Sequence, residues 1–343
     1  MLFEKTPSDV RDLLPVPIKK LGLKLEGSPI ERHVEQLFRE LKSKGLEHFR
    51  PAFYLTDEWG CPSEQPIIGV PFYLADPRIG AIESAVNDIE NEREIMMYMR
   101  HEAGHAFNYA YELYKTDEWR ELFGPFRRPY RDHYRFVPFS RNYVRHIAGW
   151  YAQKHPDEDF AETFAVWLTP RSNWREKYKN WPAIRKLRYL DRIAHELADK
   201  APIRPLGQTD FTVEDMEETI EEFYRETARD ESQKVADLAL DVDLDDIFEH
   251  ADEVVPERAR NAGELVNEHR REIVDKVSYW TGVRRTLVKS LVEAIAGKVE
   301  EMRLVVDKTR EREQIVELTV YITTLAMNFF SARRFERKSH ELS

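Results

Sequence analysis

The distribution of glycine and proline limits the folds open to this chain. Residues 1–209 mix apolar runs, aromatic residues and frequent turn signals. After residue 210, glycine and proline occur at four positions: Pro256, Gly263, Gly282 and Gly297. Long stretches without them favour helices, whereas a mixed stretch favours strands and turns. The segment 201–210, APIRPLGQTD, also loses hydrophobic periodicity. We therefore predict a first domain at 1–205 and a second domain at 210–343.

Several helices are expected in the first domain. The range 30–44 carries an apolar stripe at helical spacing, with Ser28 as the expected N-cap and Pro29 at the first position. The range 83–114 predicts one or two helices, because apolar residues recur there with a period of about 3.6 residues. A later helix is expected to begin at Pro156, after an aromatic and loop-rich stretch.

Two short runs predict strands at 52–56 and 67–74. Pro71 interrupts the second run, and because proline cannot donate to a ladder, an edge position is expected. Helices and strands in this order predict an α+β domain with a small mixed sheet. An exposed edge of the second strand would suit an extended peptide, which binds by adding a strand.

The second domain is expected to be an all-helical bundle. Amphipathic patterns predict four helices, at about 212–239, 258–280, 282–308 and 311–335. Residues 210–257 contain 19 acidic and 3 basic residues, a net charge of −16, whereas residues 258–343 contain 17 basic and 13 acidic residues, a net +4. The acidic segment argues against a nucleic-acid partner. A solvated face and a docking surface for a basic protein partner are both open, so recruitment, oligomerisation and regulation by autoinhibition are alternatives for this domain.

Composition bears on compartment and membranes. Cys61 is the only cysteine, which excludes an internal disulfide and a cysteine-based zinc site. The N-terminal residues lack a positive region followed by an apolar one, so we expect no secretory signal and a cytoplasmic location. The most apolar stretch, 314–330, contains Glu317 and Asn328 and is shorter than the roughly 20 apolar residues of a membrane span. A buried helix and no membrane partner are expected.

The segment 101–105, HEAGH, has the pattern H-E-x-x-H. Residues four apart lie on one face of a helix, so His101 and His105 can bind one ion. Glu102 lies beside the first ligand and could act as general base towards a metal-activated water. The pattern therefore predicts a Zn²⁺ site in a hydrolytic enzyme.

A third ligand is expected from a later helix. The positions that carry glycine and histidine in the three-histidine form of the motif are Asn108 and Tyr111, which rules that form out. In the stretch 155–168, HPDEDFAETFAVWL, Glu158 and Glu162 lie one turn apart on the same side. Glu158 can bind zinc while Glu162 accepts the second N–H of a ligating histidine.

The same stretch contains two aspartates. Asp157 and Asp159 are expected on other faces of the helix, where they would interact with its N-terminus. Apolar residues are expected to anchor this helix in a core: Phe160, Phe164, Val166 and Trp167.

Three stretches resemble a known family. RHEAGHAFNYAY, HIAGWYAQKHPDEDFAETFAVWL and the upstream DEWG…IIGVPFYLADPR are similar to the bacterial family described as "putative zinc-binding metallopeptidase". More broadly they are similar to the gluzincins, including a lethal-factor-like group with an E-x-F-A-E second motif. The resemblance covers about residues 20–200, none of the helical half, and implies a zincin-like fold for the first domain. The chain departs from the wider gluzincins in lacking an N-E-x-x-S-D segment.

The resemblance implies roles position by position. It implies that His101, His105 and Glu158 bind Zn²⁺, that Glu102 is catalytic, and that Glu162 supports a ligand.

It also implies that Tyr151 stabilises the transition state, as a phenol that donates to an oxyanion. A packing role is the alternative for this tyrosine. His133 and His146 are rival donors in the preceding loop. Four arginines there could hold a substrate carboxylate or simply line a solvated loop: Arg127, Arg128, Arg131 and Arg135.

The expected function is zinc-dependent hydrolysis of peptide bonds in a peptide or protein substrate. One alternative is a zinc-containing binding or regulatory protein that acts through its helical domain, although a structural site would not need Glu102. A second alternative is a zinc amidase, similar to a deformylase, that acts on small molecules. A closed cleft with no free strand edge would favour this last reading.

Overall fold

The computed structural model describes residues 3, 6–87, 89–130, 134, 136–232, 241–283 and 285–340. By its contacts the chain divides into two compact units, Met1–Tyr224 and Arg225–Ser343. Each unit has a hydrophobic core of its own. The break expected at 201–210 lies inside the first unit.

Residues 205–224 belong to the first unit because they pack back onto it. The backbone N–H of Ile18 donates to the carbonyl of Glu218 over 2.9 Å. The ring of Phe223 lies edge-on against that of Phe72, with centroids 5.2 Å apart. Residues 201–210, which contain proline and glycine, therefore connect two parts of one unit. Local sequence signals alone could not reveal these long-range contacts.

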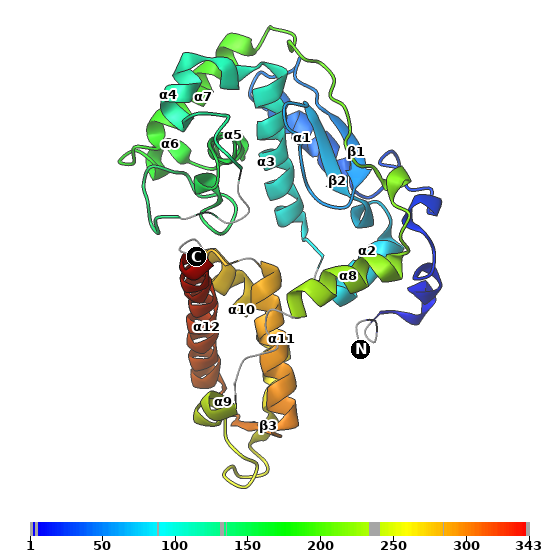
Figure 1. The fold of residues 1–343 in the computed structure, drawn as a ribbon, viewed down its shortest axis with the longest axis vertical. Helices are drawn as coiled ribbons and strands as arrows, with labels where there is room; N and C mark the ends of the chain where they lie inside the picture. Colours follow the sequence, from blue (N-terminus) through cyan, green and yellow to red (C-terminus); the bar gives the residue numbers. More distant parts are fainter. Residues whose placement is uncertain are drawn as a thin grey trace. The chain divides into compact units, whose positions relative to one another are not determined.

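Short helices and loops surround a few long helices in the first unit (Figure 1). The α-helices are α1 (Glu31–Ser43), α2 (Pro77–Val86), α3 (Glu92–Ala110), α4 (Asp117–Phe123), α5 (Pro156–Leu168), α6 (Trp174–Lys177), α7 (Ile184–Leu197) and the start of α8 (Ile220–Ser232). The 3₁₀ helices are η1 (Ser8–Leu13), η2 (Ile18–Lys20), η3 (Phe72–Leu74), η4 (Leu113–Lys115), η5 (Tyr151–Gln153) and η6 (Val213–Asp215).

Some helices begin after a capping side chain, whereas α1, α6 and α7 begin without one. Asn91 caps α3, and Glu94 completes a capping box by accepting from the backbone N–H of Asn91. The expected cap of the first helix is wrong: α1 begins at Glu31 after Ile30, without a side-chain cap. The hydroxyl of Ser28 instead donates to the carbonyl of Leu25 over 2.6 Å, within the preceding turn.

The sheet of the first unit consists of β1 (Ala52–Thr56) and β2 (Ile67–Pro71), paired in parallel. The strand predicted for 67–74 ends at Pro71, and the chain continues as η3. The other edge of β2 is not free at its centre. Gly69 N donates to Gly60 O over 2.7 Å, and Gly60 N donates to Gly69 O over 3.3 Å. The hypothesis that a peptide adds to this edge is therefore wrong at Gly69.

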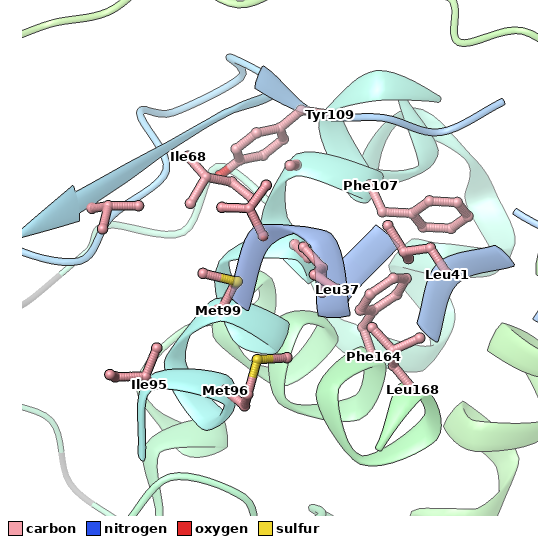
Figure 2. Close-up of a cluster of buried hydrophobic side chains, with 14 of the residues drawn as sticks. Leu37, Leu41, Ile68, Ile95, Met96, Met99, Phe107, Tyr109, Phe164 and Leu168 are labelled. Atoms are coloured by element: carbon pink, nitrogen blue, oxygen red, sulfur yellow. The ribbon is translucent and has the colours of Figure 1, made fainter. Parts of the chain in front are cut away.

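The core of the first unit forms around α3. Apolar side chains from four elements meet there (Figure 2): Leu37 and Leu41 of α1, Ile68 of β2, Ile95, Met96, Met99 and Phe107 of α3, and Phe164 and Leu168 of α5. In Figure 1, α3 lies between α1 with the strands on one side and α4 to α7 on the other. This burial fixes α3 against α5, the two helices that carry the H-E-x-x-H motif and the acidic stretch.

The second unit is mostly helical. Its helices are α9 (Asp241–Ile247), α10 (Ala262–Thr281), α11 (Arg285–Glu301) and α12 (Glu311–His340). A short antiparallel pair, β3 (Ala259–Asn261) with β4 (Val305–Asp307), corrects the all-helical prediction. The helices predicted at 258–280 and 282–308 extended into these strands, whereas β-branched Val305 and Val306 suit a strand.

Part of the predicted helix at 212–239 lies outside the described residues. Within the described part of the chain, no helix is both long enough and apolar enough to cross a membrane.

Candidate metal centre

Helices α3 and α5 cross at a glycine. A Cβ atom on Gly104 would lie 2.8 Å from the Cα of Ala161 and 3.0 Å from its carbonyl oxygen. Only glycine allows the two backbones to approach so closely. The crossing brings the face of α3 that carries His101 and His105 against the first turns of α5, where Glu158 lies.

Three potential ligand atoms converge in this buried contact. Glu158 Oε2 lies 2.9 Å from His101 Nε2 and 3.2 Å from His105 Nε2. The two Nε2 atoms are 3.1 Å apart, and the three side chains form a group that could hold a metal ion. Ligand atoms about 2.0–2.2 Å from a tetrahedral zinc ion would be about 3.3 Å apart. The separations are therefore close to those of a zinc site.

The hydrogen bonds around the ring nitrogens test whether these residues fit a cation. His101 Nδ1 donates to Glu162 Oε1 over 3.0 Å, and His105 Nδ1 donates to Asp157 Oδ2 over 2.9 Å. A carboxylate only accepts, so each Nδ1 carries a proton, and each ring would point a lone pair of Nε2 inward once a metal ion displaces the proton there. Two such lone pairs and a carboxylate oxygen then face one point without a donor between them, which is the donor set that zinc requires.

The surrounding carboxylates also act on the imidazoles electrostatically. Burial lowers the pKa of His101, but hydrogen bonds to Glu158 and Glu162 outweigh burial and raise it to about 9. The pKa of His105 is also raised, because Asp157 and Glu158 overcome the effect of burial. The surrounding carboxylates thus favour positive charge at the two imidazoles, and a metal ion must compete with protons for the ring nitrogens.

Glu162 is fixed from two directions. Besides His101, it accepts the backbone N–H groups of His146 over 3.1 Å and Ile147 over 3.0 Å. These bonds orient the carboxylate and, through it, the ring of His101.

Asp157 is a functional residue that sequence reasoning missed. It was expected to interact with the helix N-terminus, but it accepts from His105, from Asn108 Nδ2 over 2.7 Å and from the hydroxyl of Tyr109. A signal for it existed, because two ligating imidazoles require two acceptors for their second N–H groups, and Glu162 can serve only one. The helix N-terminus is capped instead by His155, whose Nδ1 accepts from Asp157 N over 3.2 Å.

Removing the Asp157 carboxylate should weaken metal binding. We expect Asp157→Ala to lower zinc affinity by about 10–100-fold, because His105 loses the partner that fixes its tautomer and orientation. Competition with a chromophoric chelator measures this affinity. Asp199→Ala, at an exposed position, is the matched control and should bind zinc as the parent does. Unchanged zinc affinity in Asp157→Ala would contradict the role given to this carboxylate.

Asp159 also differs from its prediction. It is fully buried and pairs with Lys186 Nζ over 2.5 Å. Burial raises the pKa of Asp159 to about 7, although Lys186 opposes the shift. This pair ties α5 to α7, away from the helix N-terminus where the sequence suggested it would act.

Glu102 is a buried carboxylate that forms no hydrogen bond or ion pair with any described residue. Only 7% of it is exposed. Burial raises the pKa of its carboxyl, while His101 and His105 oppose the shift. A buried carboxylate without a hydrogen bond costs stability, so its place beside the three convergent ligands has no structural explanation.

Two tyrosines meet the outer oxygen of Glu158. The Tyr151 hydroxyl lies 3.4 Å from Glu158 Oε1, and its ring centroid lies 5.5 Å from that of His101. Tyr130, which sequence reasoning missed, donates to the same oxygen over 2.5 Å. No sequence signal distinguishes it from the other loop aromatics.

The remaining candidates take other roles or lie outside the description. The ring of His146 donates through Nε2 to the carbonyl of Met97 over 2.9 Å, which is a structural contact with α3. Arg128 donates to the carbonyl of Lys154. Three predicted residues lie outside the described residues: His133, Arg131 and Arg135.

Comparison with known proteins bears on this site. Residues 82–179 match the model of a family described as "Putative zinc-binding metallo-peptidase". This segment is similar to that family. The matched segment contains α3 and α5, and therefore the three potential metal ligands His101, His105 and Glu158. The match confirms the predicted family and the predicted zinc cofactor, over a shorter range than the expected 20–200. No curated protein and no solved structure matches the chain.

Proposed function

We propose that the first unit hydrolyses peptide bonds with zinc held by His101, His105 and Glu158, and with Glu102 as general base. The ligand set of two histidines and a later glutamate is that of a gluzincin, and we propose a zincin-like fold for the same reason. One observation carries the proposal: Glu102, which follows His101 in the helix that carries two of the three convergent ligands, is buried and pairs with no described residue.

Each side chain has a defined task in this reaction. Zinc bound at the site would polarise the substrate carbonyl and lower the pKa of water to about 7. Glu102 would take a proton from that water and pass it to the leaving amine. Asp157 and Glu162 keep the two imidazoles oriented through their Nδ1–H groups.

A phenol would stabilise the oxyanion that develops in the transition state. Burial and Glu158 raise the pKa of Tyr151, so its hydroxyl stays protonated and can donate. Tyr151 remains our proposed donor, and Tyr130 is its neighbour at 3.5 Å between hydroxyl oxygens.

Metal removal tests the proposal. The purified full chain should contain about one zinc per chain and cleave members of a peptide library. A chelator should abolish cleavage, because the water and the carbonyl lose their activating ion, and added zinc should restore it. A chain that holds stoichiometric zinc and cleaves no peptide would contradict the proposed function.

One observation favours a second candidate function. Gly60 is hydrogen-bonded to Gly69 at the edge of β2, so a substrate peptide cannot pair with the centre of that strand. A zinc amidase that acts on small amides would not need a free strand edge for substrate binding. Assaying small N-acyl amides alongside the peptides separates the two candidates.

For residues 225–343 we propose recruitment, oligomerisation or regulation of the first unit. A chain ending after Tyr224 is the appropriate truncation for testing these roles. One ending near Arg204 would lose the residues that complete the first unit.

A further inference from the structure

A lysine lies beside the proposed catalytic centre. Lys154 follows η5, and its Nζ lies 4.2 Å from the centre of the Tyr130 ring and 5.2 Å from that of Tyr151. Both of these tyrosines meet Glu158 Oε1 through their hydroxyls. The same two rings therefore contact Glu158 through their hydroxyls and the Lys154 cation through their faces.

Lys154 has no anionic partner among the residues that the structure describes. In the described part of the chain, Lys154 Nζ makes neither an ion pair nor a hydrogen bond, and the residue is half-buried. An ammonium group has three donors, and aromatic faces satisfy none of them as a carboxylate would. With respect to the described residues, Lys154 thus has hydrogen-bond donors available beside the proposed site.

The backbone of Lys154 is held in place. Arg128 Nη2 donates to the carbonyl of Lys154 over 2.6 Å. His155 Nε2 in turn donates to the carbonyl of Arg128 over 2.8 Å, because its Nδ1 is the acceptor that caps α5. Arg128, one of the four arginines for which carboxylate binding and a solvated loop surface were alternatives, therefore positions the lysine.

An acidic residue lies within electrostatic range of this lysine. The positive charge of Lys154 lowers the pKa of Glu58, although the larger effect of desolvation raises it. The side chain of Glu58 is exposed. The neighbouring Trp59 is anchored by stacking on Tyr98 and by its Nε1–H, which donates to Glu90 over 3.2 Å. Glu58 is too far away to form an ion pair with Lys154, so it does not satisfy the ammonium group, but it would repel a substrate carboxylate.

We infer that Lys154 binds a carboxylate of the substrate next to the scissile bond, so that the enzyme selects peptides with an acidic side chain or a free C-terminus there. This inference rests on the proposed peptide hydrolysis. It assigns Lys154 a role in specificity and none in the chemical step.

Binding to the zinc-loaded full-length Glu102→Gln chain tests this without turnover. Three matched peptides serve as probes: a neutral peptide with an amidated C-terminus, the same peptide with one glutamate, and the neutral peptide with a free C-terminus. At least one carboxylate peptide should bind about tenfold more tightly than the neutral one, and which of them does so identifies the source of the carboxylate.

Charge variants made in this background decide the assignment. Lys154→Met keeps the apolar stem on the rings and should abolish the preference, whereas Lys154→Arg should retain it. Glu58→Gln should strengthen the preference, because a repelling charge is removed. Zinc content and thermal unfolding verify that each variant is folded. A preference that is absent in the parent chain, or that persists in Lys154→Met, would overturn the inference.

Cleavage by the wild-type chain separates this inference from the proposed function. If no peptide is cleaved, the hydrolytic proposal fails, and the binding measurements still decide the role of Lys154. If neutral and acidic peptides are cleaved with equal kcat/KM, hydrolysis stands and the inference about Lys154 fails.

Discussion

Replacing Glu102 with glutamine should lower peptide hydrolysis by about 10²–10⁴-fold while zinc remains bound. Glutamine has nearly the same shape, but its amide cannot take a proton from water. Because Glu102 is buried and pairs with none of the described residues, neutralising it removes a desolvation cost, so the thermal unfolding temperature should not fall. Steady-state kinetics, metal analysis and a melting curve measure the three quantities.

The control for this variant is Glu92→Gln at the exposed start of α3. It removes the same charge from the same helix, far from the ligands, and should hydrolyse peptides at the parental rate. Retained hydrolysis in Glu102→Gln would remove the proposed base. Loss of zinc would instead show that Glu102 maintains the metal site.

Gly104→Ala should destabilise the first unit and weaken zinc binding at the same time. The added Cβ would meet the backbone of Ala161 at 2.8 Å and Phe164 Cβ at 3.0 Å. Backbone atoms cannot rotate away, so α3 and α5 must separate, at a cost of about 1–3 kcal/mol from overpacking. Alanine favours a helix over glycine by about 1 kcal/mol, which offsets part of this cost.

Separation of the two helices moves Glu158 away from both histidines. Zinc affinity should therefore fall by at least about tenfold, comparable with loss of a residue that orients a ligand. Gly297→Ala in α11 is the control, because its added Cβ would meet nothing within 4 Å. It should raise stability by up to about 1 kcal/mol and leave zinc binding unchanged. A Gly104→Ala chain that behaves like this control would disprove the close crossing.

The spacing of chemistry-bearing residues made part of the site predictable. Two histidines four apart on a helix must face one point, and a metal there needs an acid from elsewhere. This reasoning named Glu158 and Glu162, which the structure brings to His101 and His105. The family match supports zinc independently.

The missed features depend on contacts between distant residues. Asp157 stands one residue before Glu158, and only the crossing of α3 and α5 decides that it reaches His105. Tyr130 lies in a loop without a periodic pattern that would place its side chain. The pairing of β3 with β4 joins segments more than forty residues apart, which a local pattern cannot show.

The packing of residues 205–224 onto the first unit has a consequence for synthesis on the ribosome. Ile18 and Lys19 donate to the carbonyls of Glu218 and Met216, so these contacts between the two ends of the unit can form only after residue 218 has been synthesised. The helices that carry the metal ligands emerge much earlier, and their contact needs none of these partners. A nascent chain could therefore bind its metal ion before residues 205–224 have packed onto the rest of the unit. Until those residues leave the ribosome, the apolar side chains of Ile18 and Phe72, which are buried in the folded unit, would be exposed to solvent.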